Sequence, residues 1–153
     1  MTTTVNAKPA MILLIEDDKG DQELIRRALE KGKIQNDLFI LEDGEQALDY
    51  LLRRGRYSDP ALSPRPDLVL LDLNLPKIDG RKVLEEIRST DELKRLVVVI
   101  LTTSKQDKDI IRSYEMGVNS YITKPPDFQQ FVKVVQEVGH YWFQVVVLPP
   151  KEE

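Results

Sequence analysis

Four apolar runs of the sequence each end in side chains that could do chemistry. In chain order these are the carboxylates of Glu16 and Asp17, the carboxylate of Asp72, the hydroxyl of Thr102 and the ammonium of Lys124. A buried strand that delivers an ionisable group to the surface is typical of a binding or catalytic site. If the strands are parallel, all four ends share one edge of a sheet, and these groups converge there.

Three carboxylates at one edge would repel one another and raise at least one pKa unless a cation lay among them. The chain has no cysteine and a single histidine, His140, to which we assign no chemistry. Oxygen ligands favour Mg²⁺, and Mn²⁺ could replace it chemically. Thr102 and Lys124 add a hydroxyl donor and a positive charge. The set suits phosphoryl transfer in which Asp72 is the nucleophile and forms an acyl phosphate.

Taken singly, each of these residues has an ordinary structural explanation. Acidic residues after a strand favour the start of a helix, and this is our interpretation of Asp18. Thr102 is a β-branched residue of a kind common in strands, and a lysine before proline is usually solvated. Tyr121 is explained equally well as a packing residue and as part of a switch. The combination of groups, in this order, is what favours a site.

Alternating apolar and amphipathic segments predict the elements that would position these groups. We expect strands at 11–15, 38–41, 68–72, 96–101 and 118–122, and helices ending near Gly32 and Leu52 and spanning 80–89, 107–116 and 127–142. Near-continuous Val, Ile and Leu in the third and fourth strands indicates burial on both faces. The pattern predicts a doubly wound α/β fold with a five-stranded parallel sheet and five helices.

The flavodoxin-like strand order 2-1-3-4-5 is the one that places Asp17 next to Asp72, although the sequence alone does not force it. Residues 53–66 contain Gly55 and three prolines, and we expect a long irregular surface loop there.

Length and charge limit the classes of protein. At 153 residues the chain suits one domain, with a flexible leader at 1–10, a folded domain at 11–142 and an apolar tail at 143–153. Its 22 basic and 26 acidic residues are mixed along the chain and give a net charge of −4, which argues against binding to nucleic acid. We expect a cytoplasmic protein, because no signal peptide or stretch of roughly 20 apolar residues is present.

The sequence resembles the receiver domains of two-component response regulators over about residues 10–140. The motifs are the pair Glu16-Asp17, the acceptor Asp72 with Asn74 and Pro76, Asp79-Gly80, Thr102-Thr103, and Tyr121 followed by Thr123-Lys124-Pro125.

By this resemblance, Asp72 accepts a phosphoryl group from a histidine kinase. Asp17, Asp72 and the Asn74 carbonyl bind Mg²⁺, and Glu16 holds the metal through water. The resemblance also implies that Thr102 and Lys124 contact the phosphoryl oxygens, that Thr102 and Tyr121 form the switch, and that the peptide before Pro125 is cis.

Within the family, the loop before Pro66, the acceptor turn and the apolar tail resemble the small stand-alone regulators of bacterial and cyanobacterial phytochromes. This likeness implies a phytochrome-type kinase partner. It also implies a homodimer through helix 4, strand 5 and helix 5, with contributions from Trp142 and residues 145–148. The branched Thr103, where the family usually has a smaller residue, predicts slow autodephosphorylation.

Three other classes were weighed against this one. A haloacid-dehalogenase-type phosphatase needs a general acid two residues after its nucleophile, whereas position 74 is Asn. A flavin-binding flavodoxin-like protein needs a glycine- and hydroxyl-rich phosphate loop where this chain has Glu16 and Asp17. A receiver-fold interaction module without phosphorylation would not require the intact set of Asp17, Asp72, Thr102 and Lys124.

Overall fold

The computed structural model describes residues 9–32, 35–102, 117–118, 120–124, 129–131, 133–134 and 137. Within them lies a five-stranded sheet whose paired strands all run parallel, in the order β2-β1-β3-β4-β5. The strands are β1 (Ala10–Ile15), β2 (Asn36–Leu41), β3 (Leu68–Asp72), β4 (Val98–Thr102) and β5 (Ser120–Thr123). The predicted α/β class and strand order are confirmed.

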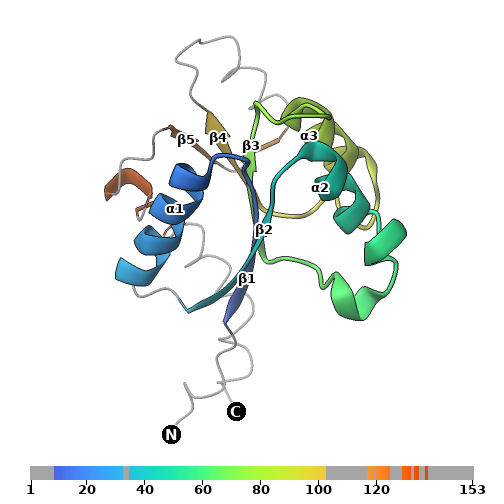
Figure 1. Cartoon of the computed structure of the whole chain (residues 1–153), viewed down its shortest axis with the longest axis horizontal. Coiled ribbons are helices and arrows are strands. Elements are labelled where there is room, and N and C mark those ends of the chain that lie inside the picture. The colour runs from blue at the N-terminus through green and yellow to red at the C-terminus, as the bar shows by residue number, and fades with distance from the viewer. Residues whose placement is uncertain are drawn as a thin grey trace, which may run out of the picture.

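Helices cover both faces of this sheet, with α1 (Lys19–Lys31) on one side and α2 (Gly44–Leu51) and α3 (Gly80–Ser89) on the other (Figure 1). The helix expected at 107–116 lies outside the described residues. The helix expected at 127–142 is helical at 129–131, 133–134 and 137, which are the positions described there. None of the described helices has the length and apolar character needed to cross a membrane.

Among the described residues, α1, α2 and α3 each begin at an aspartate that follows a strand or turn. Asp18 accepts the N–H of Gly20 at 2.7 Å, Asp43 that of Gln46 at 2.7 Å, and Asp79 that of Arg81 at 2.9 Å. A side-chain oxygen at the N-cap satisfies backbone donors that have no partner inside the helix. The structure thus confirms Asp18 as a cap.

Buried hydrophobic residues of the described part of the chain form two clusters, one on each face of the sheet. One includes Leu71, Leu84 and Tyr50 beneath α2 and α3, and the other includes Leu70 and Phe131 together with the inner face of α1. Every residue of β3 and β4 is buried, as expected for central parallel strands with helices on both faces. The two central strands thereby carry Asp72 and Thr102 on rigid elements.

The segment at 53–66 lies mostly on the surface, as expected, but it is not irregular throughout. This segment forms two 3₁₀ turns, Gly55–Tyr57 and Pro60–Leu62, and buries Tyr57 and Ser63. The Tyr50 hydroxyl donates to the Pro64 carbonyl at 2.7 Å, and Arg65 donates to the Leu51 carbonyl at 2.8 Å. Side-chain bonds to backbone carbonyls therefore add to the backbone bonds of the two turns and tie the segment to α2.

Candidate functional site

The carboxyl ends of β1, β3, β4 and β5 bring the predicted groups to one edge of the sheet. Glu16 follows β1, Asp72 ends β3, Thr102 ends β4 and Lys124 follows β5. One carboxylate oxygen from each of Glu16, Asp17 and Asp72 lies within 4.8 Å of the others. Glu16 and Asp72 are buried and Asp17 is exposed, so the cluster opens to solvent on the Asp17 side.

Lys124 points into this acidic cluster. Its Nζ lies 2.8 Å from Glu16 Oε1, 3.0 Å from Asp72 Oδ2 and 3.1 Å from Asp21 Oδ2. Its backbone N–H donates to the Thr102 carbonyl at 2.6 Å, a bond that continues the pairing of β4 with β5. The strand pairing therefore sets where the lysine stem begins, and the carboxylates set where its ammonium ends.

The backbone anchors the second oxygen of each buried carboxylate. Asp72 Oδ1 accepts the N–H of Asn74 at 2.9 Å, and Glu16 Oε2 accepts the N–H of Asp18 at 2.9 Å. Each carboxylate thus turns one oxygen toward the turn that follows its strand and the other toward Lys124. This two-sided attachment fixes the carboxylates before any ligand arrives.

Burial governs the electrostatics here. It raises the pKa of Glu16 to about 7, although the ion pair with Lys124 opposes the rise. Burial also raises the pKa of Asp72, and bonds from the Asn74 N–H and Lys124 oppose it. For Lys124 burial alone would lower the pKa, but its contacts with Glu16 and Asp72 outweigh burial and raise it.

The charge balance of these residues fits a divalent cation. Glu16, Asp17 and Asp72 carry three negative charges when ionised, and Lys124 supplies one positive charge. Glu16 Oε1 is buried and lies 2.8 Å from Lys124 Nζ. Because a carboxylate oxygen can accept more than one contact, it can also serve a metal or a metal-bound water. Oxygen ligands of this kind suit Mg²⁺ or Mn²⁺.

Two glycines allow the loop between β3 and α3 to pack tightly against the site. A Cβ on Gly80 would lie 2.1 Å from the Asp72 carbonyl, and one on Gly44 would lie 1.9 Å from the Ile78 carbonyl. Gly44 also donates its N–H to Pro76 at 3.2 Å. The start of α2 therefore braces the loop that carries Asn74.

The remaining predicted residues have these places in the fold. Thr102 is buried at the end of β4 and pairs in register with Thr123. Tyr121 is half-buried and packs against the core beneath α2 and α3. Asn74 is exposed in the turn after Asp72. Thr103, Pro125, Trp142 and the tail at 143–153 lie outside the described residues.

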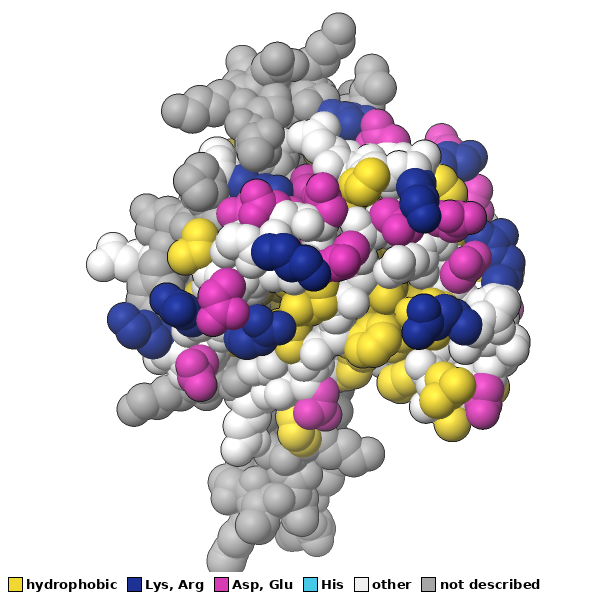
Figure 2. Space-filling view, in the orientation of Figure 1, with side chains coloured by type: hydrophobic (Ala, Val, Ile, Leu, Met, Phe, Trp, Pro, Cys, Tyr) yellow, Lys and Arg dark blue, Asp and Glu magenta, His cyan; other side chains and the backbone are white. Residues whose placement is uncertain are grey.

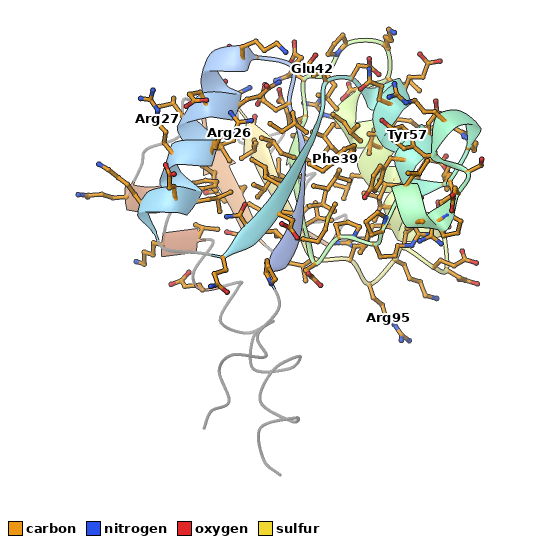
Figure 3. All side chains as sticks on the ribbon, turned by 60° about the horizontal axis from the view of Figure 1, so that its bottom comes forward. Arg26, Arg27, Phe39, Glu42, Tyr57 and Arg95 are labelled. Atoms are coloured by element: carbon orange, nitrogen blue, oxygen red, sulfur yellow. The ribbon has the colours of Figure 1, made fainter. Side chains whose placement is uncertain are left out.

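Sequence reasoning missed two residues of α1, Asp21 and Gln22. Asp21 contacts Lys124, as described above. Gln22 is buried and donates to the Glu16 carbonyl at 2.7 Å and to the Glu42 carboxylate at 2.9 Å. Glu42 lies at the same end of the sheet as the start of α1 (Figure 3) and also pairs with Lys19. Their position in the first turn after Asp17 was the only available signal.

Comparisons with known proteins agree with this geometry. The model of the family described as "Response regulator receiver domain" matches residues 12–136. Response regulator Rcp1 of Synechocystis sp. is 47% identical over 141 residues, which are 92% of this chain and 94% of that protein.

Two solved structures are similar along nearly the whole chain. The Mn²⁺-bound form of response regulator Rcp1 is 46% identical with a TM-score of 0.76, and the match covers 91% of this chain and 98% of that one. The phosphorylated cyanobacterial phytochrome response regulator RcpA is 41% identical with a TM-score of 0.77, covering 92% and 98%.

Proposed function

The chain belongs to the family of response regulator receiver domains, and from that premise we propose that Asp72 is its phosphoacceptor. The observation that carries the proposal is the buried Asp72 carboxylate, held between the Asn74 N–H and the Lys124 ammonium. In this function the protein accepts a phosphoryl group from a histidine kinase, and the new charge alters a surface that a partner protein reads.

The proposed step forms one bond and breaks one bond. A carboxylate oxygen of Asp72 attacks the phosphorus of a phosphohistidine, a P–O bond forms, and the P–N bond breaks with its electron pair leaving on the imidazole. Lys124, already 3.0 Å from Asp72 Oδ2, donates to an oxygen of the incoming phosphoryl group. Thr102, at the end of the neighbouring strand, is the proposed second donor.

We propose Mg²⁺ as the physiological ion, held by Asp17, Asp72 and the Asn74 carbonyl, with Glu16 acting through water. When bound, a divalent ion neutralises the excess of carboxylate charge and the charge on the phosphoryl oxygens. Two observations support a divalent ion. Carboxylate oxygens of Glu16, Asp17 and Asp72 lie within 4.8 Å of one another, and the similar protein Rcp1 has a Mn²⁺-bound form.

The proposed phosphoryl donor is a histidine kinase of the phytochrome type. Its support is the likeness to RcpA, named as a phytochrome response regulator, along most of this chain.

We further propose a cytoplasmic location and a homodimer through helix 4, strand 5, helix 5 and the tail at 143–153. Apart from β5 and a few helical residues, the proposed dimer face lies outside the described residues.

The decisive experiment measures intact mass after incubation with acetyl phosphate and Mg²⁺, with and without EDTA. We expect wild type to gain one phosphate, about 80 Da, and the Asp72→Asn variant to gain none. EDTA should abolish the gain. No adduct on wild type would instead favour an interaction module that keeps the fold without the chemistry, while an adduct on Asp72→Asn would place the acceptor elsewhere.

A further inference from the structure

We propose that Asp21 is a positioning residue that keeps the Lys124 ammonium directed at Asp72. The proposal rests on the proposed function and adds a residue outside the family motifs quoted above. Asp21 lies on α1, and the phosphoacceptor lies on β3. The structure joins them through one lysine.

Three carboxylates surround the Lys124 ammonium. An ammonium group has three N–H donors, and three carboxylate oxygens lie 2.8 to 3.1 Å from Nζ, on Glu16, Asp21 and Asp72. The side chains of Lys124 and Asp21 are only 7% and 14% exposed. Water therefore screens this pair much less than a surface pair.

The local structure of α1 explains why Asp21 turns toward the lysine. Asp21 is the third residue of the helix, and an acidic side chain at this position often accepts the N–H of the cap residue. Here the N–H of the cap, Asp18, donates to Glu16 Oε2 at 2.9 Å. Because Glu16 already satisfies that donor, the Asp21 carboxylate bonds to Lys124 instead.

Phosphorylation and metal binding change Glu16 and Asp72, the other two partners of Lys124, but do not change Asp21. Asp72 loses its charge when it becomes an acyl phosphate, and Glu16 belongs to the acidic group that fits a metal. Asp21 is not part of that group. It is therefore the one of the three carboxylates whose contact with Lys124 can persist unchanged, and it limits the positions that this long, flexible side chain can adopt.

A simpler role for Asp21 is to stabilise α1, because an acidic side chain in the first turn interacts favourably with the helix dipole. That role would not involve Lys124. The experiment must therefore measure the chemical reactivity of the Lys124 amine itself, independently of phosphorylation.

The first arm labels lysine amines in the metal-free protein with acetic anhydride and measures modification at each lysine by peptide mass spectrometry. We expect Asp21→Asn to raise the labelling rate at Lys124 about three- to tenfold, since the ammonium loses a charged partner. Labelling at the exposed Lys94 should not change. Glu23→Gln is the matched control, because Glu23 lies on the same helix and pairs with Arg26 and Arg27 instead.

The second arm measures the rate of phosphorylation by acetyl phosphate at saturating Mg²⁺. We expect Asp21→Asn to slow it about three- to tenfold, Asp21→Ala to slow it more, and Glu23→Gln to leave it unchanged. In a Lys124→Ala background, Asp21→Asn should have no further effect, because the two residues then act through the same interaction.

An unchanged rate of Lys124 labelling in Asp21→Asn would overturn the proposal. It would also be overturned if Asp21→Asn slowed phosphorylation as much in the Lys124→Ala background as it does in wild type. If Asp21→Ala does not fold, the nearly isosteric Asp21→Asn decides. If wild type takes up no phosphate, the proposed function fails, but the labelling arm still decides whether Asp21 positions the lysine.

Discussion

Two regions of this molecule differ in how their buried polar groups are compensated. One is the aromatic cluster of Phe39, Tyr50 and Tyr57 beside α2, and the other is the carboxyl edge, formed by the acidic residues and lysine of the site. In the aromatic cluster the ring centroids lie 5.2 to 6.4 Å apart. The buried Tyr50 hydroxyl has the Pro64 carbonyl as its partner, so no charge there needs compensation.

At the carboxyl edge three carboxylates face one ammonium, and burial raises the pKa of both Glu16 and Asp72. Over the described surface in Figure 2, by contrast, acidic and basic side chains intermingle. The aromatic cluster therefore stabilises the fold. The carboxyl edge instead lowers stability, because its carboxylates are not fully compensated until a cation binds. Substitutions in the two regions should therefore have opposite consequences.

The largest expected effect lies in the aromatic cluster. Tyr50 is fully buried, and Tyr50→Ala should lower the free energy of unfolding by about 3–5 kcal/mol because it removes a core ring and leaves a cavity. Tyr50→Phe, which removes only the bond to Pro64, should cost about 1 kcal/mol. Urea denaturation measures both. Phosphate uptake by the folded variants should match wild type, and a loss of uptake in Tyr50→Phe would contradict the separation of the two regions.

The next effect is a pH dependence that comes from Glu16. Its pKa is about 7 in the folded protein and about 4.5 ordinarily, so between these values the folded state keeps a proton that the unfolded state has lost. In metal-free protein this contribution to stability is present below pH 4.5 and is lost as the pH rises through 7. The loss is at most about 3 kcal/mol, since each pKa unit corresponds to about 1.4 kcal/mol.

Glu16→Gln should remove this part of the pH dependence, because an amide does not titrate in this range. Urea denaturation of both proteins at several pH values between 4.5 and 8, in EDTA, makes the comparison. Parallel curves for wild type and variant would show that Glu16 keeps an ordinary pKa in the folded protein.

A matched pair of glycine substitutions tests whether the start of α2 supports the carboxyl edge. Gly44→Ala places a methyl group against the Ile78 backbone and should cost about 1–3 kcal/mol. It should also weaken Mg²⁺ binding, because the loop carrying Asn74 must move. Gly55→Ala, which meets open space at a φ of +57°, should cost about 1 kcal/mol and leave binding unchanged. Equal Mg²⁺ affinity in both variants would contradict the bracing role.

The smallest effect is stabilisation by the metal. At ten times its dissociation constant, Mg²⁺ should raise the free energy of unfolding by about 1.4 kcal/mol. The increase should be smaller at pH 6 than at pH 8, because protons compete for the carboxylates. Thermal unfolding with and without EDTA measures it, and Asp17→Asn should show a reduced response. A stabilisation that is the same at both pH values would argue against binding through Glu16.

Apolar runs and motif spacing were sufficient to predict much of this protein. The strands at 68–72 and 11–15 follow from runs of hydrophobic residues, because strands buried on both faces are mostly apolar. Asp18 as a cap follows from local hydrogen bonding within three residues. The placement of Asp72 at a strand end follows from the abrupt change to Asn74 and Pro76.

Only the tertiary structure determined the partners of Lys124 and the form of the segment at 53–66. The bond between Tyr50 and Pro64 and the ion pair between Asp21 and Lys124 join residues that are distant in sequence. Such contacts depend on which strands are neighbours, on their register and on side-chain rotamers. A local pattern can specify a strand, a cap or a turn, but the contact of Asp21 with Lys124 depends on where the start of α1 lies relative to the end of β5.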